Sequence, residues 1–215
     1  MIVPEGKYLT GPLHLASNME LRLEKGAALD RGTLLHAWFQ QIGWLEEGEP
    51  EDGLLRKAAH ELGLDALDLP ELLRQFRRAL QMPTISSALR RATYERPLRP
   101  GTVCAVHAAP GMVHARWELW RERPFAIRDG DTILSGKFDR VVALYDGEQA
   151  VGADVLDYKT DRLPCDDPRA VDARVDVYRP QLEAYRRAAA RLLGLDAGRI
   201  SARLLFVDAG IVRAV

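Results

Sequence analysis

Two runs of the chain, residues 136–145 and 155–160, have the composition of β-strands and carry charged residues in their interiors. Both are rich in β-branched and aromatic side chains, and the turn-forming pair Asp146-Gly147 follows the first run. Strand-like runs separated by such turn signals are typical of neighbouring antiparallel strands. We therefore expect a sheet in which these two segments lie side by side.

Three charged side chains of these runs are candidates for a common site. Side chains alternate between the faces of a strand, so Asp157 and Lys159 point the same way, and strand pairing can bring Asp139 near Asp157. Two neighbouring carboxylates are costly unless a cation lies between them. A lysine beside them can steer an attacking water or neutralise charge on a phosphate, which suits metal-assisted phosphodiester hydrolysis. The alternative is a plain ion pair between Asp157 and Lys159 on an exposed strand.

The order and spacing of these residues resemble a nuclease family. Asp139 followed by Asp157-Tyr158-Lys159 resembles the core of the PD-(D/E)xK nucleases. Over roughly residues 31–215, the wider pattern resembles the RecB-type branch, in particular the nuclease module that ends AddA-type helicase–nucleases. That pattern consists of Gly32-x-x-x-His36, Gly136-x-x-Asp139-Arg140, Asp157-Tyr158-Lys159-Thr160 and Gln181-x-x-x-Tyr185. A lone Asp-x-Lys is expected by chance in many chains, whereas these elements in this order are specific.

The resemblance implies a divalent metal site. Its ligands would be His36, Asp139, Asp157 and the main-chain carbonyl of Tyr158. Carboxylates, a carbonyl and water form an oxygen-rich set that suits Mg²⁺ or Mn²⁺, and one imidazole excludes neither ion. Without the resemblance, His36 would be an ordinary histidine of a helix surface or core.

The resemblance also implies residues that support the reaction. Lys159 would position the attacking water or stabilise the charge that develops on the phosphate. Gln181 and Tyr185 are four residues apart and share a face of a helix. In the family they are active-site supports that contact the DNA phosphate or the lysine, and the alternative is an ordinary polar–aromatic pair.

A further acidic residue precedes the first strand of the site. Residues 122–125, Glu-Arg-Pro-Phe, resemble the Glu-x-Pro-Phe that comes before the first catalytic aspartate in this branch. This resemblance implies that Glu122 is an active-site residue. The element is less diagnostic than the others, and Glu118 is a nearby rival.

The chain is expected to form an α/β domain with a restriction-endonuclease-like core, in which helices flank a mixed central sheet and a helical region comes first. The predicted helices cover residues 31–42, 51–62, 69–80, 85–92 and 175–193. The predicted strands cover residues 103–107, 113–120 continued at 124–127, 132–145, 154–160 and 200–207. Residues 161–173 are predicted as a surface loop and 209–215 as a short tail. A helix between two strands of one sheet is a β-α-β crossover, which makes those strands parallel.

Residues 1–30 lie outside the nuclease pattern, so the sequence predicts an extension over 1–30 and a nuclease domain over 31–215. Residues 19–26 alternate as a strand does, and the extension is expected to be β-hairpin-like. It resembles an opening rung of a polygalacturonase-like β-helix, although one rung alone cannot bury its faces. The later Asp-pair and His motifs of those hydrolases do not occur in the chain, so no sugar chemistry is inferred.

The formal net charge of −1 gives the chain no overall attraction for nucleic acid. The resemblance implies DNA as the substrate, in single-stranded form, so binding must depend on local groups of arginines. The predicted groups are Arg74, Arg77 and Arg78, then Arg90 and Arg91, and then Arg179, Arg186 and Arg187. The alternative for each group is a solvated helix face.

The sequence also excludes some features. It has no run of 18 apolar residues and no signal peptide, so a soluble, cytoplasmic protein is expected. Its 2 cysteines exclude, by count, the four-cysteine iron–sulfur site of some relatives. It lacks Gly-x-x-x-x-Gly-Lys-Ser/Thr, so a helicase motor would come from a partner subunit or a fused segment.

The predicted function is that of a metal-dependent DNA nuclease, exonuclease or endonuclease, in double-strand break processing and recombinational repair. One alternative is a catalytically silent DNA-binding module of a helicase–nuclease complex. Another is a carbohydrate-related protein, suggested by residues 1–30.

Overall fold

The computed structural model describes residues 2–3, 22–23, 31–95, 106, 112, 114–161, 163 and 167–215. Within the extension, β1 (Ile2–Val3) pairs with β2 (Arg22–Leu23) in parallel, so this pair is not a hairpin. The rest of the extension lies outside the described residues, as do both cysteines. The strand predicted over residues 103–107 also lies outside them, apart from Val106.

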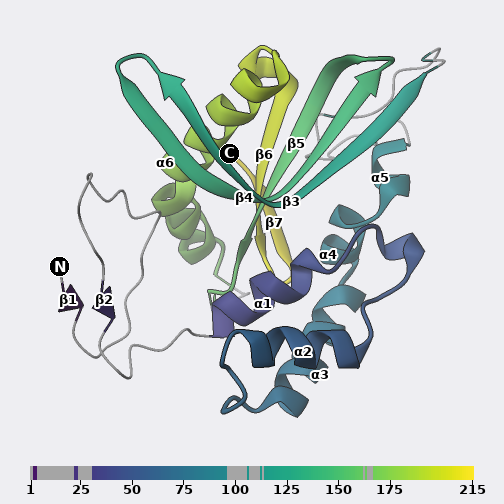
Figure 1. The fold of residues 1–215 in the computed structure, drawn as a ribbon, viewed down its shortest axis with the longest axis vertical. Coiled ribbons are helices and arrows are strands. Elements are labelled where there is room, and N and C mark those ends of the chain that lie inside the picture. The colour runs from purple at the N-terminus through teal and green to yellow at the C-terminus, as the bar shows by residue number, and fades with distance from the viewer. Residues whose placement is uncertain are drawn as a thin grey trace.

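A five-stranded mixed sheet forms the centre of the fold (Figure 1). Its strands are β3 (Ala115–Asp129), β4 (Thr132–Asp146), β5 (Gln149–Lys159), β6 (Ile200–Phe206) and β7 (Ile211–Ala214). They lie in the order β3-β4-β5-β6-β7, and only β5 and β6 run parallel to each other. The predicted mixed sheet and the parallel pair on either side of the long helix are therefore confirmed.

The predicted N-terminal helical region is also confirmed. The helices are α1 (Arg31–Gln40), α2 (Asp52–Glu61), α3 (Leu69–Gln81), α4 (Pro83–Ala88), α5 (Arg91–Glu95) and α6 (Pro168–Leu193), with short 3₁₀ turns η1 (Leu45–Glu47) and η2 (Ala197–Arg199). Local sequence explains several ends. The side chain of Asp68 accepts a hydrogen bond from the N–H of Glu71 at 3.0 Å at the start of α3. Gly194 ends α6 in the left-handed conformation, at φ 66°.

Helices cover both faces of the sheet. Leu156 and Tyr158 of β5 pack into a core with α1, α2, α3 and α4, whereas Val155 of β5 and Leu204 of β6 pack into a core with α6. Neighbouring residues of a strand point to opposite faces, so a strand covered on both sides is apolar throughout. In Figure 1, α6 lies along the sheet while α1, α2 and α3 gather at one end of it. This layered arrangement confirms the predicted restriction-endonuclease-like α/β fold.

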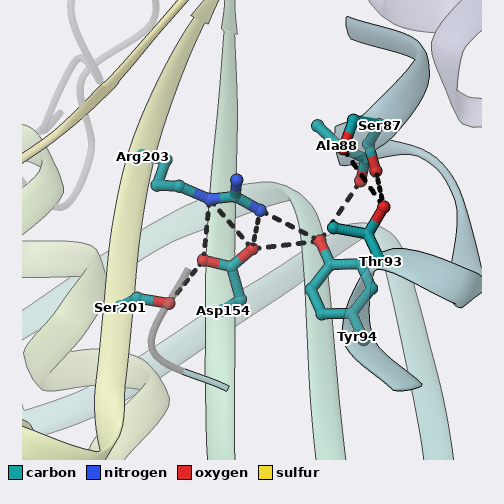
Figure 2. A network of polar contacts seen from close by, with 7 residues as sticks. All are labelled: Ser87, Ala88, Thr93, Tyr94, Asp154, Ser201 and Arg203. Carbon is teal, nitrogen blue, oxygen red and sulfur yellow. Dashed lines mark hydrogen bonds and ion pairs between the residues drawn. The ribbon is translucent and has the colours of Figure 1, made fainter. Parts of the chain in front are cut away.

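A buried polar network joins α5 to the sheet (Figure 2). Asp154 of β5 is fully buried and accepts hydrogen bonds from Ser201 Oγ, from Arg203 Nε at 3.1 Å and from the Tyr94 hydroxyl at 3.0 Å. The Tyr94 hydroxyl also lies 3.2 Å from the carbonyl oxygen of Ala88. Because Arg203 is only 5% exposed, its charge depends on Asp154 for compensation.

The surface loop predicted over residues 161–173 is wrong in its second part, because α6 begins at Pro168. The side chain of Asp167 accepts hydrogen bonds from the N–H groups of Arg169 and Ala170, at 3.0 and 3.3 Å. Proline suits the first turn of a helix, where its missing N–H would have no partner in any case. The proline that indicated a loop is therefore part of a helix start.

Other local expectations also differ from the structure. The tail predicted over 209–215 contains β7, which pairs with β6 at the edge of the sheet. The helix predicted over 85–92 is divided into α4 and α5. β3 continues through Pro124, which an edge strand tolerates because one of its sides needs no ladder hydrogen bonds. In the described parts of the chain, no helix is long and apolar enough to cross a membrane.

Candidate active site

The two central strands part at the residues that carry the charges. β4 and β5 pair as far as Arg140 and Leu156, and the next positions in this register are Asp139 and Asp157. Asp139 Oδ2 accepts a hydrogen bond from the N–H of Tyr158 at 2.7 Å, so its carboxylate reaches across to β5. Both acids are buried, with 7% of Asp139 and 2% of Asp157 exposed.

Lys159 is held beside Asp157 by residues of α6. Its Nζ lies 2.7 Å from Asp157 Oδ2 and donates a hydrogen bond to Gln181 Oε1 at 3.1 Å. Gln181 Nε2 donates in turn to the hydroxyl oxygen of Tyr185 at 3.0 Å. The ammonium also lies 4.1 Å from the centre of the Tyr178 ring, a cation–π contact. Tyr178 was not predicted, although its position three residues before Gln181 puts both on one helix face.

α1 and β3 bring two further side chains to Asp139. His36 Nδ1 lies 3.3 Å from Asp139 Oδ1 and 3.8 Å from Glu122 Oε1. Each of these three residues has a possible metal-ligand atom within 4.8 Å of those of the other two. The side chain of His36 remains 30% exposed, so the group of three opens towards solvent on this side.

Glu122 reaches the site through strand pairing. Its neighbours on β3 pair with the neighbours of Asp139 on β4, which places Glu122 opposite Asp139. Its φ of 47° lies in the left-handed region, which residues other than glycine rarely adopt outside functional or tightly constrained positions. The rival Glu118 is occupied elsewhere, since it accepts a hydrogen bond from Trp120 Nε1 at 2.7 Å.

Lys137 also joins the site and was not predicted. Its Nζ forms an ion pair with Glu122 Oε2, and its side chain is 57% exposed. The sequence signal is its position two residues before Asp139, because alternate residues of a strand share a face. One lysine of the cluster therefore contacts Glu122 and the other contacts Asp157.

Tyr158 contributes its backbone to the site. Its ring stacks on Phe39 of α1 with centroids 4.6 Å apart, and only 2% of the residue is exposed. Its N–H donates to Asp139, as described above. The predicted use of its carbonyl as a metal ligand stays a prediction.

Burial and mutual charge shift the pKa values of the cluster. Burial, followed by the charge of Asp139, raises the pKa of Asp157 to about 7. Burial would also raise the pKa of Asp139, but the charge of His36 and its hydrogen bond outweigh this and lower it. Burial would lower the pKa of His36, but Asp139 outweighs this and raises it to about 10. A divalent cation at this place would displace bound protons, since ligands bind metal in their deprotonated forms.

The chemistry of the cluster fits a hard divalent cation. Among the described side chains, Glu122 Oε1 and Asp157 Oδ2 are buried and lack a hydrogen-bond partner; Asp157 Oδ2 meets Lys159 as an ion pair only. Buried carboxylate oxygens without partners are costly, and a cation satisfies them. Carboxylates with one imidazole suit Mg²⁺ or Mn²⁺. The group that the structure gathers most closely contains Glu122 beside His36 and Asp139, whereas the sequence predicted Asp157 as the third side-chain ligand.

A comparison with protein families agrees with this geometry. The family model described as the PD-(D/E)XK nuclease superfamily matches residues 7–215. No curated protein matches the chain. Since the match covers almost all of the chain and the strands carry the Asp…Asp-x-Lys residues together, the chain belongs to the PD-(D/E)XK nuclease superfamily, whose members use divalent metal ions.

Proposed function

We propose that the chain is a RecB/AddA-type nuclease that hydrolyses phosphodiester bonds of DNA with Mg²⁺ or Mn²⁺. The observation that carries this proposal is that Asp157 and Gln181 hold the ammonium of Lys159 beside the acidic cluster. A bare ion pair on an exposed strand would leave the lysine free to solvent, but its side chain is only 13% exposed. Its position therefore favours a role in chemistry over the plain ion pair.

In this proposal His36, Asp139, Asp157 and the carbonyl of Tyr158 hold the ion, and Glu122 lies within reach of it. When bound, the ion supplies charge that polarises the scissile phosphate and lowers the pKa of a bound water. The chain itself supplies carboxylates, those of Asp139 and Asp157, that are already buried. Asp139 is fixed by the N–H of Tyr158, so no rearrangement of that side chain is needed before binding.

Lys159 has the complementary role of orienting the attacking water or stabilising charge on the phosphate. Gln181 and Tyr185 hold its ammonium through consecutive hydrogen bonds from α6. Tyr178 covers the other side of the ammonium with its ring. These three are proposed as positioning residues, because they act through the lysine.

The proposed DNA path follows α6, which carries the residues that hold Lys159. Arg179 is paired with Asp176 at 2.9 Å and Arg187 with Asp129 at 3.1 Å. For Arg186, no ion-pair partner is found among the described residues. Its charge is therefore the most available of the three for a DNA phosphate.

The arginines of α3 are a less direct candidate. Arg77 is held by Glu49 at 2.9 Å and by Asp52 at 2.6 Å, and Arg74 is held by Glu71. Together with Arg78, they line a groove of about 510 Å³ between α2 and α3. Since acidic partners compensate much of this charge, we expect the groove to contribute less to DNA binding than α6.

By the same resemblance, the chain would receive single-stranded DNA from a helicase, as a partner subunit or as part of a longer protein. That role belongs to double-strand break processing and recombinational repair. The alternative, a catalytically silent DNA-binding module, is disfavoured by the intact Asp139, Asp157 and Lys159. It makes a different prediction, because such a module would bind DNA without cutting it.

The test is degradation of linear single-stranded DNA with and without Mg²⁺ or Mn²⁺. We expect Asp157→Ala to abolish cleavage. Lys159→Ala should reduce it by at least about a hundredfold, as removal of a transition-state donor does, while the fold and most of the DNA affinity remain.

Lys57→Ala is the matched control, because Lys57 is an exposed lysine of α2 paired with Glu61 at 3.7 Å. It should cleave as the unchanged chain does. Binding without metal-dependent cleavage by the unchanged chain would support the silent module instead. Full cleavage by Lys159→Ala would show that the site is assigned to the wrong residues.

A further inference from the structure

The two lysines of the site are held in different ways. The side chain of Lys159 is 13% exposed and is fixed by Asp157 and Gln181. The side chain of Lys137 is 57% exposed, and its ammonium contacts Glu122. No other partner for it is found among the described residues. Only the lysine end of this ion pair is exposed, so Lys137 regains hydration when it leaves, whereas the largely buried Glu122 then needs another cation in its place.

Glu122 lies beneath this lysine, and its two oxygens face different neighbours. Oε1 is buried, has no hydrogen-bond partner among the described residues and lies 3.8 Å from His36 Nδ1. Oε2 carries the ion pair with Lys137. The same carboxylate therefore faces the candidate metal position with one oxygen and an exposed ammonium with the other. A divalent cation and the ammonium of Lys137 would therefore compete for the negative charge of Glu122.

The position of Lys137 also matters for the substrate. The side chains of Glu122 and Asp139 are each 8% exposed, so DNA meets the more exposed residues around the cluster first. Lys137 is exposed and contacts Glu122 of this cluster, and it lies two residues before Asp139 on the same strand. Its flexible four-carbon stem lets a displaced ammonium reach a backbone phosphate that lies above the cluster.

We propose that Lys137 is a phosphate-binding residue that the metal controls. Without metal, its ammonium neutralises Glu122; when a divalent cation takes over that carboxylate, Lys137 is released to bind a DNA phosphate next to the scissile bond. This inference rests on the proposed function and adds a residue to it. It also predicts that metal binding strengthens DNA binding through Lys137.

The first experiment measures metal binding alone, by calorimetric titration with Mn²⁺. Lys137→Met keeps most of the length of the side chain and removes the competing charge, so the Mn²⁺ affinity should rise by about two- to fivefold. Lys57→Met is the matched control, because Lys57 is a 71% exposed lysine in an ion pair outside the site, and it should leave the affinity unchanged. Unchanged or weaker Mn²⁺ binding by Lys137→Met would overturn the proposed competition.

The second experiment measures DNA binding, by fluorescence anisotropy of a cleavage-resistant phosphorothioate single strand at saturating Mn²⁺. Lys137→Met should weaken binding and lower the slope of log affinity against log salt by about 0.7, the value for one phosphate contact on a single strand. Lys137→Arg keeps the charge and should retain the slope. An unchanged slope in Lys137→Met would refute the phosphate contact.

Failure of this inference can be told apart from failure of the proposed function. If the unchanged chain binds Mn²⁺ and cleaves DNA while Lys137→Met matches it in both titrations, only the role of Lys137 is refuted. If the unchanged chain neither binds Mn²⁺ nor cleaves DNA, the proposed function itself fails.

Discussion

Replacing Asp154 by alanine should destabilise the fold by about 3–5 kcal/mol, because it would leave a buried charge without its partner. The structure supports this magnitude. Asp154 is fully buried, and it accepts hydrogen bonds from Ser201, Arg203 and Tyr94 (Figure 2). Arg203 is only 5% exposed and cannot regain hydration easily. Domains have about 5–15 kcal/mol of stability in total, so this loss is a large fraction of it.

Two further variants separate the lost charge pair from the lost hydrogen bonds. Tyr94→Phe keeps the ion pair and removes one hydroxyl, so it should cost only about 1 kcal/mol. The double variant Asp154→Ala with Arg203→Met removes both charges, and it should be more stable than Asp154→Ala alone, since it leaves no buried charge uncompensated.

The measurement is urea unfolding at pH 7, followed by far-ultraviolet circular dichroism, with midpoints compared at equal slopes. The reasoning would be refuted if Asp154→Ala lost less than about 1 kcal/mol, the value of an ordinary hydrogen bond. The single variant Arg203→Met completes the cycle. The reasoning would also be refuted if the double variant lost the sum of the losses of Asp154→Ala and Arg203→Met, because the two charges would then be independent.

Three other expectations concern pH, the DNA path and the extension. Burial would lower the pKa of His36, but Asp139 outweighs burial and raises this pKa from 6.5 to about 10. In the metal-free fold the His36–Asp139 pair therefore contributes its full stabilisation below about pH 6.5, and this stabilisation is lost as the pH rises towards 10. Urea midpoints should therefore fall more steeply from pH 7 to 10 in the unchanged chain than in His36→Gln, and equal slopes would contradict the pairing. Arg186→Glu should weaken single-stranded DNA binding more than Arg199→Glu, because Arg199 precedes β6 at the end of the sheet opposite Lys159. Equal losses of affinity in a filter-binding assay would show that the DNA path is assigned to the wrong surface. Deletion of residues 1–30 should leave cleavage largely unchanged, because no predicted site residue lies there. If the shortened chain lost the far-ultraviolet circular dichroism signal of the folded protein, the extension would be required for folding.

Several contacts of the candidate site could be predicted because their signals are local. The alternation of residues 155–160 put Asp157 and Lys159 on one face, and the observed 2.7 Å contact between them agrees with it. The four-residue spacing of Gln181 and Tyr185 likewise agrees with their hydrogen bond on α6. By contrast, the start of α6 was missed because Pro168 was taken as a loop signal, although Asp167 and Pro168 together are a helix-start signal.

Neighbours a few residues apart were enough to predict most helices and strands, and to predict which charged residues share a strand or helix face, because those properties are local. The start of α6, the strand β7 and the division between α4 and α5 were missed. The choice between Glu122 and Glu118 required the folded structure, since the register of β3 against β4 places Glu122 opposite Asp139. The folded structure also decided that Lys137 pairs with Glu122. The physical reason is that contacts between distant segments depend on strand register and on how the helices pack against the sheet, and no local pattern encodes either.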